Sequence, residues 1–301
     1  MKHVAVLMGG FSNEREVSLK TGAQVSAALR EAGFEVSEIV VTPDLSALLA
    51  ALTPRPDVVF NALHGRFGED GTIQGVLDYL NIPYTHSGVR ASAMAMDKIV
   101  AKAVFAAAGL PVAAHKVIDI AELLSHDPLP RPYVAKPVSE GSSFGVHIIK
   151  AGDNRVREIV DTWAFGAAMV EPYIPGRELT VGVLEDQALA VTEIFSGDNF
   201  YDYEAKYAIG GSRHVVPAQI PEAVTRRAKA VAVAAHKALG CCGASRADFR
   251  YDDATDNLVL LEVNTQPGMT ATSLLPEQAA MLGMSFPELC RWLVERARCR
   301  A

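Results

Sequence analysis

Val4-Ala5-Val6-Leu7, followed closely by Gly9-Gly10, is the stretch that decides how the first part of the chain folds. Consecutive apolar residues before a glycine turn are typical of a buried parallel strand. The next apolar residues recur at helical spacing, at Val25, Ala28, Leu29 and Ala32. Gly33 then ends the predicted helix as C-cap glycines do. This order of strand, turn and helix predicts a βαβ unit and therefore a parallel sheet.

The alternation of strands and helices continues beyond this first unit. Strands are predicted at 34–41 and 58–60, and helices at 45–52 and 73–80. Loops at the carboxyl ends of parallel strands carry the functional residues of such sheets. The loops at 9–14 and 64–66 occupy these places and contain Glu14 and His64. His64 is open to two interpretations, a binding residue or a residue of the turn at Gly65.

Strand spacing becomes looser after the helix around 98–108, which predicts a change of domain near residue 87. Pro175-Gly176 suggests a hinge to a third unit. Further strands are expected at 133–136, 146–150, 169–174, 179–184, 191–195 and within 247–263, and further helices at 156–163, 221–239 and 286–298. We therefore predict three α/β or α+β domains, at 1–86, 87–177 and 178–301.

The composition excludes several classes of protein. Half of the 301 residues are hydrophobic, and the formal net charge of −7 argues against a broad surface for nucleic acid. No apolar stretch approaches the length of a membrane span, and the first residues lead into a strand rather than a signal peptide. The four cysteines show no CxxC spacing and are expected to be reduced thiols of a cytosolic protein.

Polar residues on two successive strands near the end of the chain form a candidate metal site. Arg246 and Asp248 share one face of the first strand, and Glu262 and Asn264 share one face of the second. A hairpin turn at 252–257 can bring both sets together. Two carboxylates and an amide oxygen are hard ligands suited to Mg²⁺ that carries nucleotide phosphates. The alternative is a solvated strand face, but the apolar residues before Glu262 make its burial costly without a partner.

Three loops add possible chemistry. Lys136 precedes a glycine and serine loop at 137–145 that can close on phosphate oxygens, although it is not a P-loop and no GxGxxG follows the first strand. The irregular loop 265–270 could stabilise an oxyanion beside Arg246. The polar, aromatic segment 200–207 could be a lid that excludes water, with Lys206 neutralising an anion. Each loop alone is also compatible with a plain connector or turn.

Several motifs together resemble the D-alanine–D-alanine ligases of the ATP-grasp family, in order along nearly the whole chain. They are Gly9 to Ser18, Leu63 to Gly71, Met96-Asp97-Lys98, Lys136-Pro137 with Glu140 to Ser143, Tyr201 to Tyr207 and Glu262 to Thr270. The resemblance implies an ATP-grasp fold with an N-terminal parallel-sheet (Rossmann-like) domain. It implies ATP between the central and C-terminal domains and synthesis of D-alanyl-D-alanine through a D-alanyl phosphate. It also implies a cytoplasmic homodimer that acts in peptidoglycan synthesis.

The resemblance also implies roles for individual residues. ATP would meet Lys98, Lys136, Ser142, Ser143, Glu171, Ile174, Glu178 and Lys206, and two Mg²⁺ ions, or Mn²⁺, would be held by Asp248, Glu262 and Asn264. Glu14 and His64 would serve the first D-alanine, Arg246 and the Gly268 N–H the oxyanion, and Ser273, the Leu274 N–H and Lys206 the second D-alanine. Ser142 and Tyr207 would link the central loop to the lid.

Three positions depart from the family pattern. Pro172 stands where relatives commonly have lysine, Gln266 replaces a usual serine, and Ala244 replaces a bulky aromatic residue. A ligase that uses D-lactate differs only in the nucleophile, and such relatives typically carry histidine at the position of Tyr207. A nucleotide-binding regulatory module is the rival from another class. A dinucleotide oxidoreductase is disfavoured because GxGxxG is missing.

Overall fold

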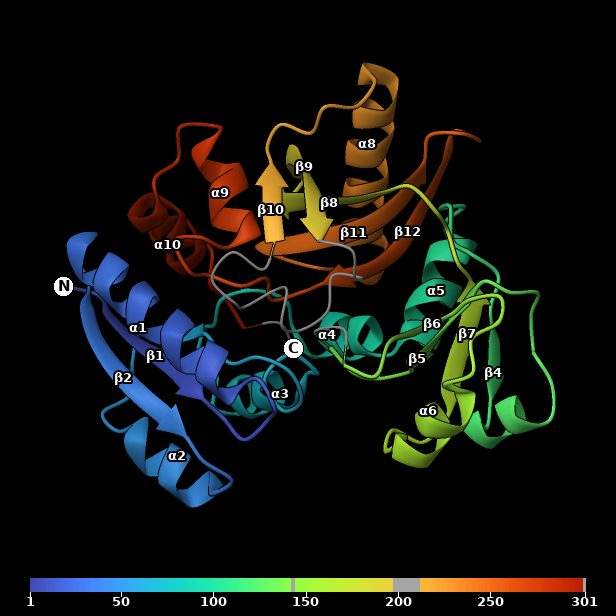
Figure 1. Ribbon diagram of the computed structural model, residues 1–301. Helices are drawn as coiled ribbons and strands as arrows, with labels where there is room; N and C mark the ends of the chain where they lie inside the picture. Colours follow the sequence, from blue (N-terminus) through green and yellow to red (C-terminus); the bar gives the residue numbers. More distant parts are fainter. Residues whose placement is uncertain (142–143, 197–211, 300–301) are drawn as a thin grey trace.

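The computed structural model describes residues 1–141, 144–196 and 212–299, and within them the strands form three sheets (Figure 1). The first sheet is parallel, and the second and third are antiparallel. The predicted fold class, α/β with an N-terminal parallel sheet, is confirmed. The domain limits at 86/87 and 177/178 stay predictions.

The N-terminal sheet has the strand order β2-β1-β3, and its helices alternate with its strands. In chain order its elements are β1 (His3–Gly9), α1 (Arg15–Glu31), β2 (Glu35–Val41), α2 (Leu45–Ala51), β3 (Val58–Asn61) and α3 (Thr72–Tyr79). Gly33 has a φ of +88°, a conformation that glycine adopts without strain, as expected after a helix end. The predicted βαβ pattern is confirmed, and the functional loops follow β1 and β3.

Both faces of this sheet are covered. Val4 and Val6 of β1 pack in one core with α1 and with α10 (Phe286–Glu295), whereas Ala5 and Leu7 pack in another core with α2 and α3. Alternate residues of a strand point to opposite faces, which produces this division. Figure 1 shows α10, close to the carboxyl end, lying beside α1. A helix from the far end of the chain therefore helps to complete the N-terminal core.

The central sheet has the order β4-β7-β5-β6 and carries the first part of the candidate site. Its elements and neighbours are α4 (Val89–Met96), α5 (Lys98–Ala107), β4 (Lys116–Ile118), the 3₁₀ helix η1 (Ile120–Leu124), β5 (Tyr133–Pro137), β6 (His147–Ile149), α6 (Val156–Thr162) and β7 (Ala168–Pro172). The Asp97 carboxylate caps α5 by accepting from the Ile99 and Val100 N–H groups. This cap fixes Lys98 in the first turn of α5.

The C-terminal sheet has the order β10-β9-β8-β11-β12. Its elements are β8 (Arg177–Leu184), β9 (Gln187–Ser196), β10 (Ser212–Val215), α8 (Glu222–Leu239), β11 (Ala244–Asp252), β12 (Asn257–Asn264) and α9 (Leu274–Ala280). Alanines of α8 pack against Ala247 and Phe249 of β11 on one face. The opposite face of β11 is left for Arg246 and Asp248.

The sequence predicted a terminal helix that continues to Arg298, and this prediction is wrong at the last turn. Helix α10 ends at Glu295, and Arg298 forms an antiparallel bridge with Tyr84, which itself bridges Val59 of β3. The backbone of Arg298 thus extends the N-terminal sheet instead of the helix. No helix in the described ranges has the length and apolar character needed to cross a bilayer.

Candidate active site

The hairpin of β11 and β12 brings the predicted metal ligands together. Asp248 lies directly opposite Glu262, and Arg246 lies opposite Asn264. Side chains at opposite positions of an antiparallel pair share one face and lie about 5 Å apart at Cβ. The prediction that this hairpin gathers the four side chains is confirmed.

Arg246 and Asp248 form a fork-shaped ion pair at the surface of the site. Arg246 Nε lies 2.9 Å from Asp248 Oδ1, and Arg246 Nη2 lies 2.8 Å from Asp248 Oδ2. Thr180 Oγ1 on β8 donates to the same Oδ1 at 2.6 Å. The orientation of the Asp248 carboxylate is therefore fixed from two strands.

A single cavity lies between the central and C-terminal sheets and contains most of the predicted nucleotide-site residues. Its lining includes Lys98, Lys136, Glu171, Ile174, Glu178, Arg246, Asp248 and Glu262, together with apolar residues such as Val134, Ile194 and Leu261. Cations, carboxylates and apolar side chains are thus combined in one place. This arrangement suits a ligand with an aromatic end and an anionic end.

Glu171 on β7 is a buried carboxylate held by two lysines. Lys136 Nζ on β5 lies 2.5 Å from its Oε1, and Lys102 Nζ on α5 lies 2.5 Å from its Oε2. Burial raises the pKa of Glu171, but the two lysines outweigh that effect and hold the pKa at about 2. Glu171 is therefore ionised at neutral pH and orients Lys136. Lys102 was not predicted as a site residue, because its position on α5 gives no local sign of its partner.

Lys98 connects the same cavity to the loop after β5. Its Nζ donates to the Glu140 carbonyl oxygen at 2.5 Å and lies 3.8 Å from Glu262 Oε2. Its backbone N–H donates to the Val138 carbonyl oxygen. The N-terminus of α5, the loop at 138–140 and the hairpin therefore meet at this lysine.

The two N-terminal loops meet around Glu14 and His64, which are both buried. His64 Nδ1 pairs with Glu69 Oε1 at 2.9 Å, and its Nε2 lies 3.1 Å from Thr21 Oγ1. Burial lowers the pKa of His64, but Glu69, with help from Glu14, more than offsets this and leaves the pKa raised. The Arg246 guanidinium lowers the same pKa slightly.

Gly65 is required by the close approach of the same loops. Its φ is +68°, and a Cβ added there would lie 2.8 Å from Glu14 Oε2. Any other residue at this position would displace the carboxylate. The two interpretations of His64, as a binding residue or as a residue of the turn at Gly65, are thus compatible. The turn itself places the histidine near Glu14.

Gly268 and Ser273 lie close together after β12. Ser273 Oγ accepts from the Thr270 N–H at 3.0 Å and would lie 3.1 Å from a Cβ added at Gly268. Ser273 is the N-cap residue of α9, and Leu274 is its first helical residue. The N–H groups of a first helical turn have no partner within the helix, so this end favours an anion.

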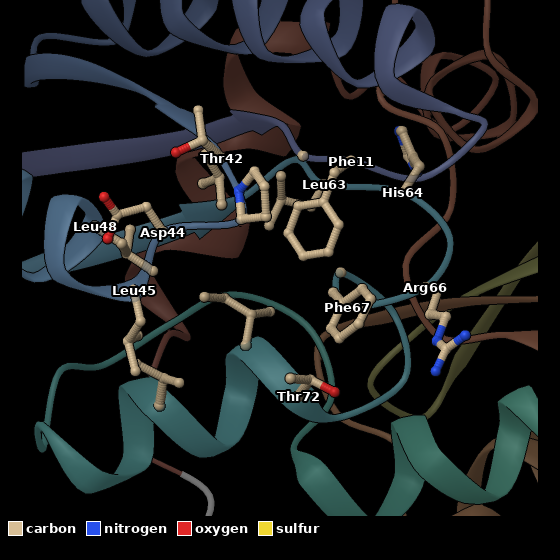
Figure 2. A pocket seen from close by; sticks show the side chains of 16 residues that line it. Phe11, Thr42, Asp44, Leu45, Leu48, Leu63, His64, Arg66, Phe67 and Thr72 are labelled. Carbon is tan, nitrogen blue, oxygen red and sulfur yellow. The ribbon is translucent and has the colours of Figure 1, made fainter.

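Figure 2 shows a second pocket, on the outer side of the N-terminal loops. It is lined mainly by apolar side chains, with Phe11 and Phe67 at its centre, their ring centroids 4.5 Å apart. The side chains of His64 and Arg66 lie at its margin and point away from the centre (Figure 2). Residues of the loop that carries His64 form part of this pocket, and no lysine among the described residues lines it.

Comparison with known families agrees with this geometry. A family model described as the D-ala D-ala ligase C-terminus matches residues 104–295, and one described as the D-ala D-ala ligase N-terminus matches residues 45–87. The chain belongs to the D-alanine–D-alanine ligase family. The D-alanine–D-alanine ligase of Acidiphilium cryptum (strain JF-5) is 69% identical over 301 residues, with 100% of both chains covered. That of Granulibacter bethesdensis is 65% identical, with 100% of this chain and 99% of the relative covered.

Two crystal structures of D-alanine–D-alanine ligase family members are similar to this chain. The enzyme from Bacillus anthracis complexed with ATP is 30% identical, with a TM-score of 0.81 and coverage of 98% of this chain and 96% of that one. A second structure of that enzyme is 31% identical, with a TM-score of 0.84 and coverage of 98% and 97%. The ATP-grasp fold expected from the resemblance is therefore confirmed.

The donor set of the hairpin fits a magnesium site of this ligase family. In the described part of the chain, no three His, Cys, Asp or Glu side chains form a group that could hold a metal by themselves. Asp248 and Glu262 supply two carboxylates, and Asn264 supplies an amide oxygen that accepts from the Gln266 N–H at 2.9 Å. Such a set leaves ligand positions for phosphate oxygens and water, as Mg²⁺ prefers.

Four predicted site residues of the ligase, Ser142, Ser143, Lys206 and Tyr207, lie outside the described residues. Of the departures from the family pattern, Pro172 is exposed at the end of β7 and lines the charged cavity. Ala244 is fully buried in an apolar cluster with Leu184 and Leu275, so the small side chain has a packing role. Gln266 is buried and spans two loops, which the sequence did not reveal.

Proposed function

We propose that this protein joins two D-alanines at the expense of ATP, giving D-alanyl-D-alanine, ADP and phosphate for peptidoglycan precursors. The observation that carries the proposal is the cavity in which Lys98 and Lys136 face the carboxylates of Asp248 and Glu262. The proposed reaction takes place in the cytoplasm, where ATP is supplied. A homodimer, expected for the family, is part of the proposal and can be tested by light scattering.

ATP would lie between the central and C-terminal sheets. Val134, Ile194 and Leu261 offer apolar surface for the adenine, next to Ile174 in the connector. Glu171 lies at the start of this connector, Glu178 would meet the ribose, and Lys98 and Lys136 would meet the phosphates with Ser142 and Ser143. The buried Glu171 holds the Lys136 ammonium in place before the nucleotide arrives.

Asp248, Glu262 and Asn264 would hold two Mg²⁺ ions, for which Mn²⁺ could substitute because it takes the same oxygen ligands. Bound Mg²⁺ offsets the negative charge that otherwise repels a carboxylate from the γ-phosphate. Arg246 and Thr180 hold the Asp248 carboxylate in one orientation.

In the first step Glu14 would hold the ammonium of the first D-alanine, with His64 beside it. A carboxylate oxygen of that D-alanine attacks the γ-phosphorus, the bond to ADP breaks, and an acyl phosphate forms. Lys98 and Lys136, which both line this cavity, would supply positive charge to the transferring group.

In the second step the neutral amine of the second D-alanine attacks the acyl carbon. Arg246 and the Gly268 N–H would stabilise the oxyanion, and phosphate then leaves. Ser273, the Leu274 N–H and Lys206 would hold the carboxylate of this second substrate.

A lid that includes Lys206 and Tyr207 would exclude water from the acyl phosphate, with Ser142 and Tyr207 as the connection to the central loop.

The test is phosphate release by the purified protein with ATP, Mg²⁺ and each of D-alanine, L-alanine and D-lactate, with product identified by mass spectrometry. D-Alanine alone should give rapid release and the dipeptide. Release without any amino acid, or only with D-lactate together with D-alanine, would contradict the proposal.

A further inference from the structure

Two buried side-chain amides join the loop after β3 to the loop after β12. Asn61 ends β3 and Gln266 follows β12, and both are almost completely buried. Asn61 Nδ2 donates to Gln266 Oε1 at 2.7 Å, and Gln266 Nε2 donates to the carbonyl oxygen of Leu63. The two amides thus bond each other across parts of the chain that are distant in sequence.

The residue before His64 is held through both of its backbone polar groups. The Leu63 N–H donates to Asn61 Oδ1 at 3.2 Å, while its carbonyl accepts from Gln266. Asn61 Nδ2 also donates to the carbonyl oxygen of Gly68 at 2.9 Å. The loop that carries His64 is therefore held by hydrogen bonds at Leu63 and at Gly68.

Gln266 also reaches the candidate metal site. Its backbone N–H donates to Asn264 Oδ1 at 2.9 Å, which fixes the orientation of that side-chain amide. One residue therefore contacts the backbone next to His64 and the side chain of a proposed metal ligand. A serine, the usual residue of relatives, would keep the backbone N–H contact with Asn264, but its side chain has a single polar atom and cannot bond both Asn61 and Leu63.

We propose that Gln266 is a positioning residue that sets the first D-alanine at the correct distance from the phosphate-binding hairpin. This inference rests on the proposed function, because it assigns the first D-alanine to the loop that carries His64. The glutamine side chain acts on this loop through Asn61 and Leu63, and its backbone N–H holds the Asn264 side chain. Small changes in the placement of a nucleophile lower the rate of a displacement strongly.

The test uses Gln266→Met, which keeps the length and volume of the side chain but removes both amide bonds. We expect kcat/KM for the first D-alanine to fall about tenfold, because the buried Leu63 carbonyl loses its partner and the loop relaxes. KM for ATP should stay within about twofold of wild type, since Gln266 does not line the cavity that contains Lys98 and Lys136. Hydrogen exchange in peptides that cover 60–68 should become faster. Gln266→Ser is the second variant if methionine prevents folding, with the same expected pattern.

The matched control is His236→Leu, which removes a buried hydrogen bond of 2.7 Å to Ser245 on the opposite face of β11. It should lower the melting temperature without a selective change in either kcat/KM for the first D-alanine or KM for ATP. The positioning role would be overturned if Gln266→Met impaired the use of ATP and of D-alanine equally. Unchanged kcat/KM for the first D-alanine would also overturn it. If the wild-type protein does not ligate D-alanine, the proposed function fails, and exchange at 60–68 still reports whether Gln266 holds the loop.

Discussion

Lys102 Nζ lies 2.5 Å from Glu171 Oε2, and both side chains are almost completely buried. Because Lys136 pairs with the other oxygen of the same carboxylate, Glu171 is shared between a lysine of the proposed ATP site and a lysine behind it. Lys102 therefore offsets part of the negative charge of Glu171 that would otherwise act on Lys136 alone.

We expect Lys102→Met to destabilise the protein by about 3 kcal/mol, because removal of one partner of a buried ion pair costs about 3–5 kcal/mol and Lys136 still pairs with Glu171. ATP should also bind more weakly. Without Lys102, Lys136 is the only described partner of the Glu171 carboxylate, so more of the Lys136 charge is offset by Glu171 and less is available to the phosphates. Denaturant unfolding and nucleotide binding measure the two effects. Arg226→Met, which breaks the exposed pair with Glu222, is the control and should cost less than about 1 kcal/mol. Equal stability of the two variants would refute the structural role of Lys102.

His64 should make stability depend on pH. Its pKa in the folded protein is raised above the ordinary value of 6.5, so its stabilising contribution is complete below that value and is lost as pH rises through the folded pKa. Glu69→Gln removes the main group that raises the pKa, and burial should then bring it down. The free energy of unfolding should consequently no longer fall as pH rises across this range.

Nuclear magnetic resonance titration of the histidine rings measures the shift directly. His147, whose pKa is lowered mainly by burial, lies in the central sheet and should titrate identically in both proteins. If Glu69→Gln leaves the titration of His64 unchanged, the pair with Glu69 does not raise the pKa of that histidine.

Glu262→Gln should nearly abolish turnover, because a neutral amide offsets less of the Mg²⁺ charge than a carboxylate does. The melting temperature should change little, since the Glu262 side chain is 36% exposed. Asp253→Asn makes the same chemical change at the far end of the hairpin, where the carboxylate pairs with Arg177, and should leave turnover intact. Turnover of Glu262→Gln within about threefold of wild type, roughly 0.7 kcal/mol in barrier, at saturating Mg²⁺ would remove Glu262 from the metal site.

Glu14→Gln should raise KM for the first D-alanine while ATP affinity stays nearly constant. The lost charge-assisted hydrogen bond is worth about 1.5–3 kcal/mol. Glu16→Gln is the matched control, because Glu16 is an exposed neighbour that pairs only with Arg15 among the described residues. If D-alanine saturation and melting temperature are both normal in Glu14→Gln, the first substrate binds on another loop.

The sequence predicted those parts of the site that depend on local patterns. Alternation along two strands was enough to place Asp248 and Glu262 on one face, and the hairpin confirms it. Lys102 was not predictable in the same way, because its partner Glu171 lies 69 positions further along the chain. Gln266 was noticed only as a departure, since its contacts with Asn61 and Leu63 come from 205 and 203 positions away. Pairings that depend on how the sheets come together leave no periodic signal in either segment.

The packing of α10 on the N-terminal sheet affects how the chain folds during its synthesis. Val4 and Val6 leave the ribosome early, but Leu289 and Leu293, which cover them, are translated only after the central and C-terminal sheets. Until then the part of this face that α1 does not cover stays open to water or to a chaperone. A chain whose translation stops before residue 286 therefore lacks part of its first core, even though every residue of that sheet is present.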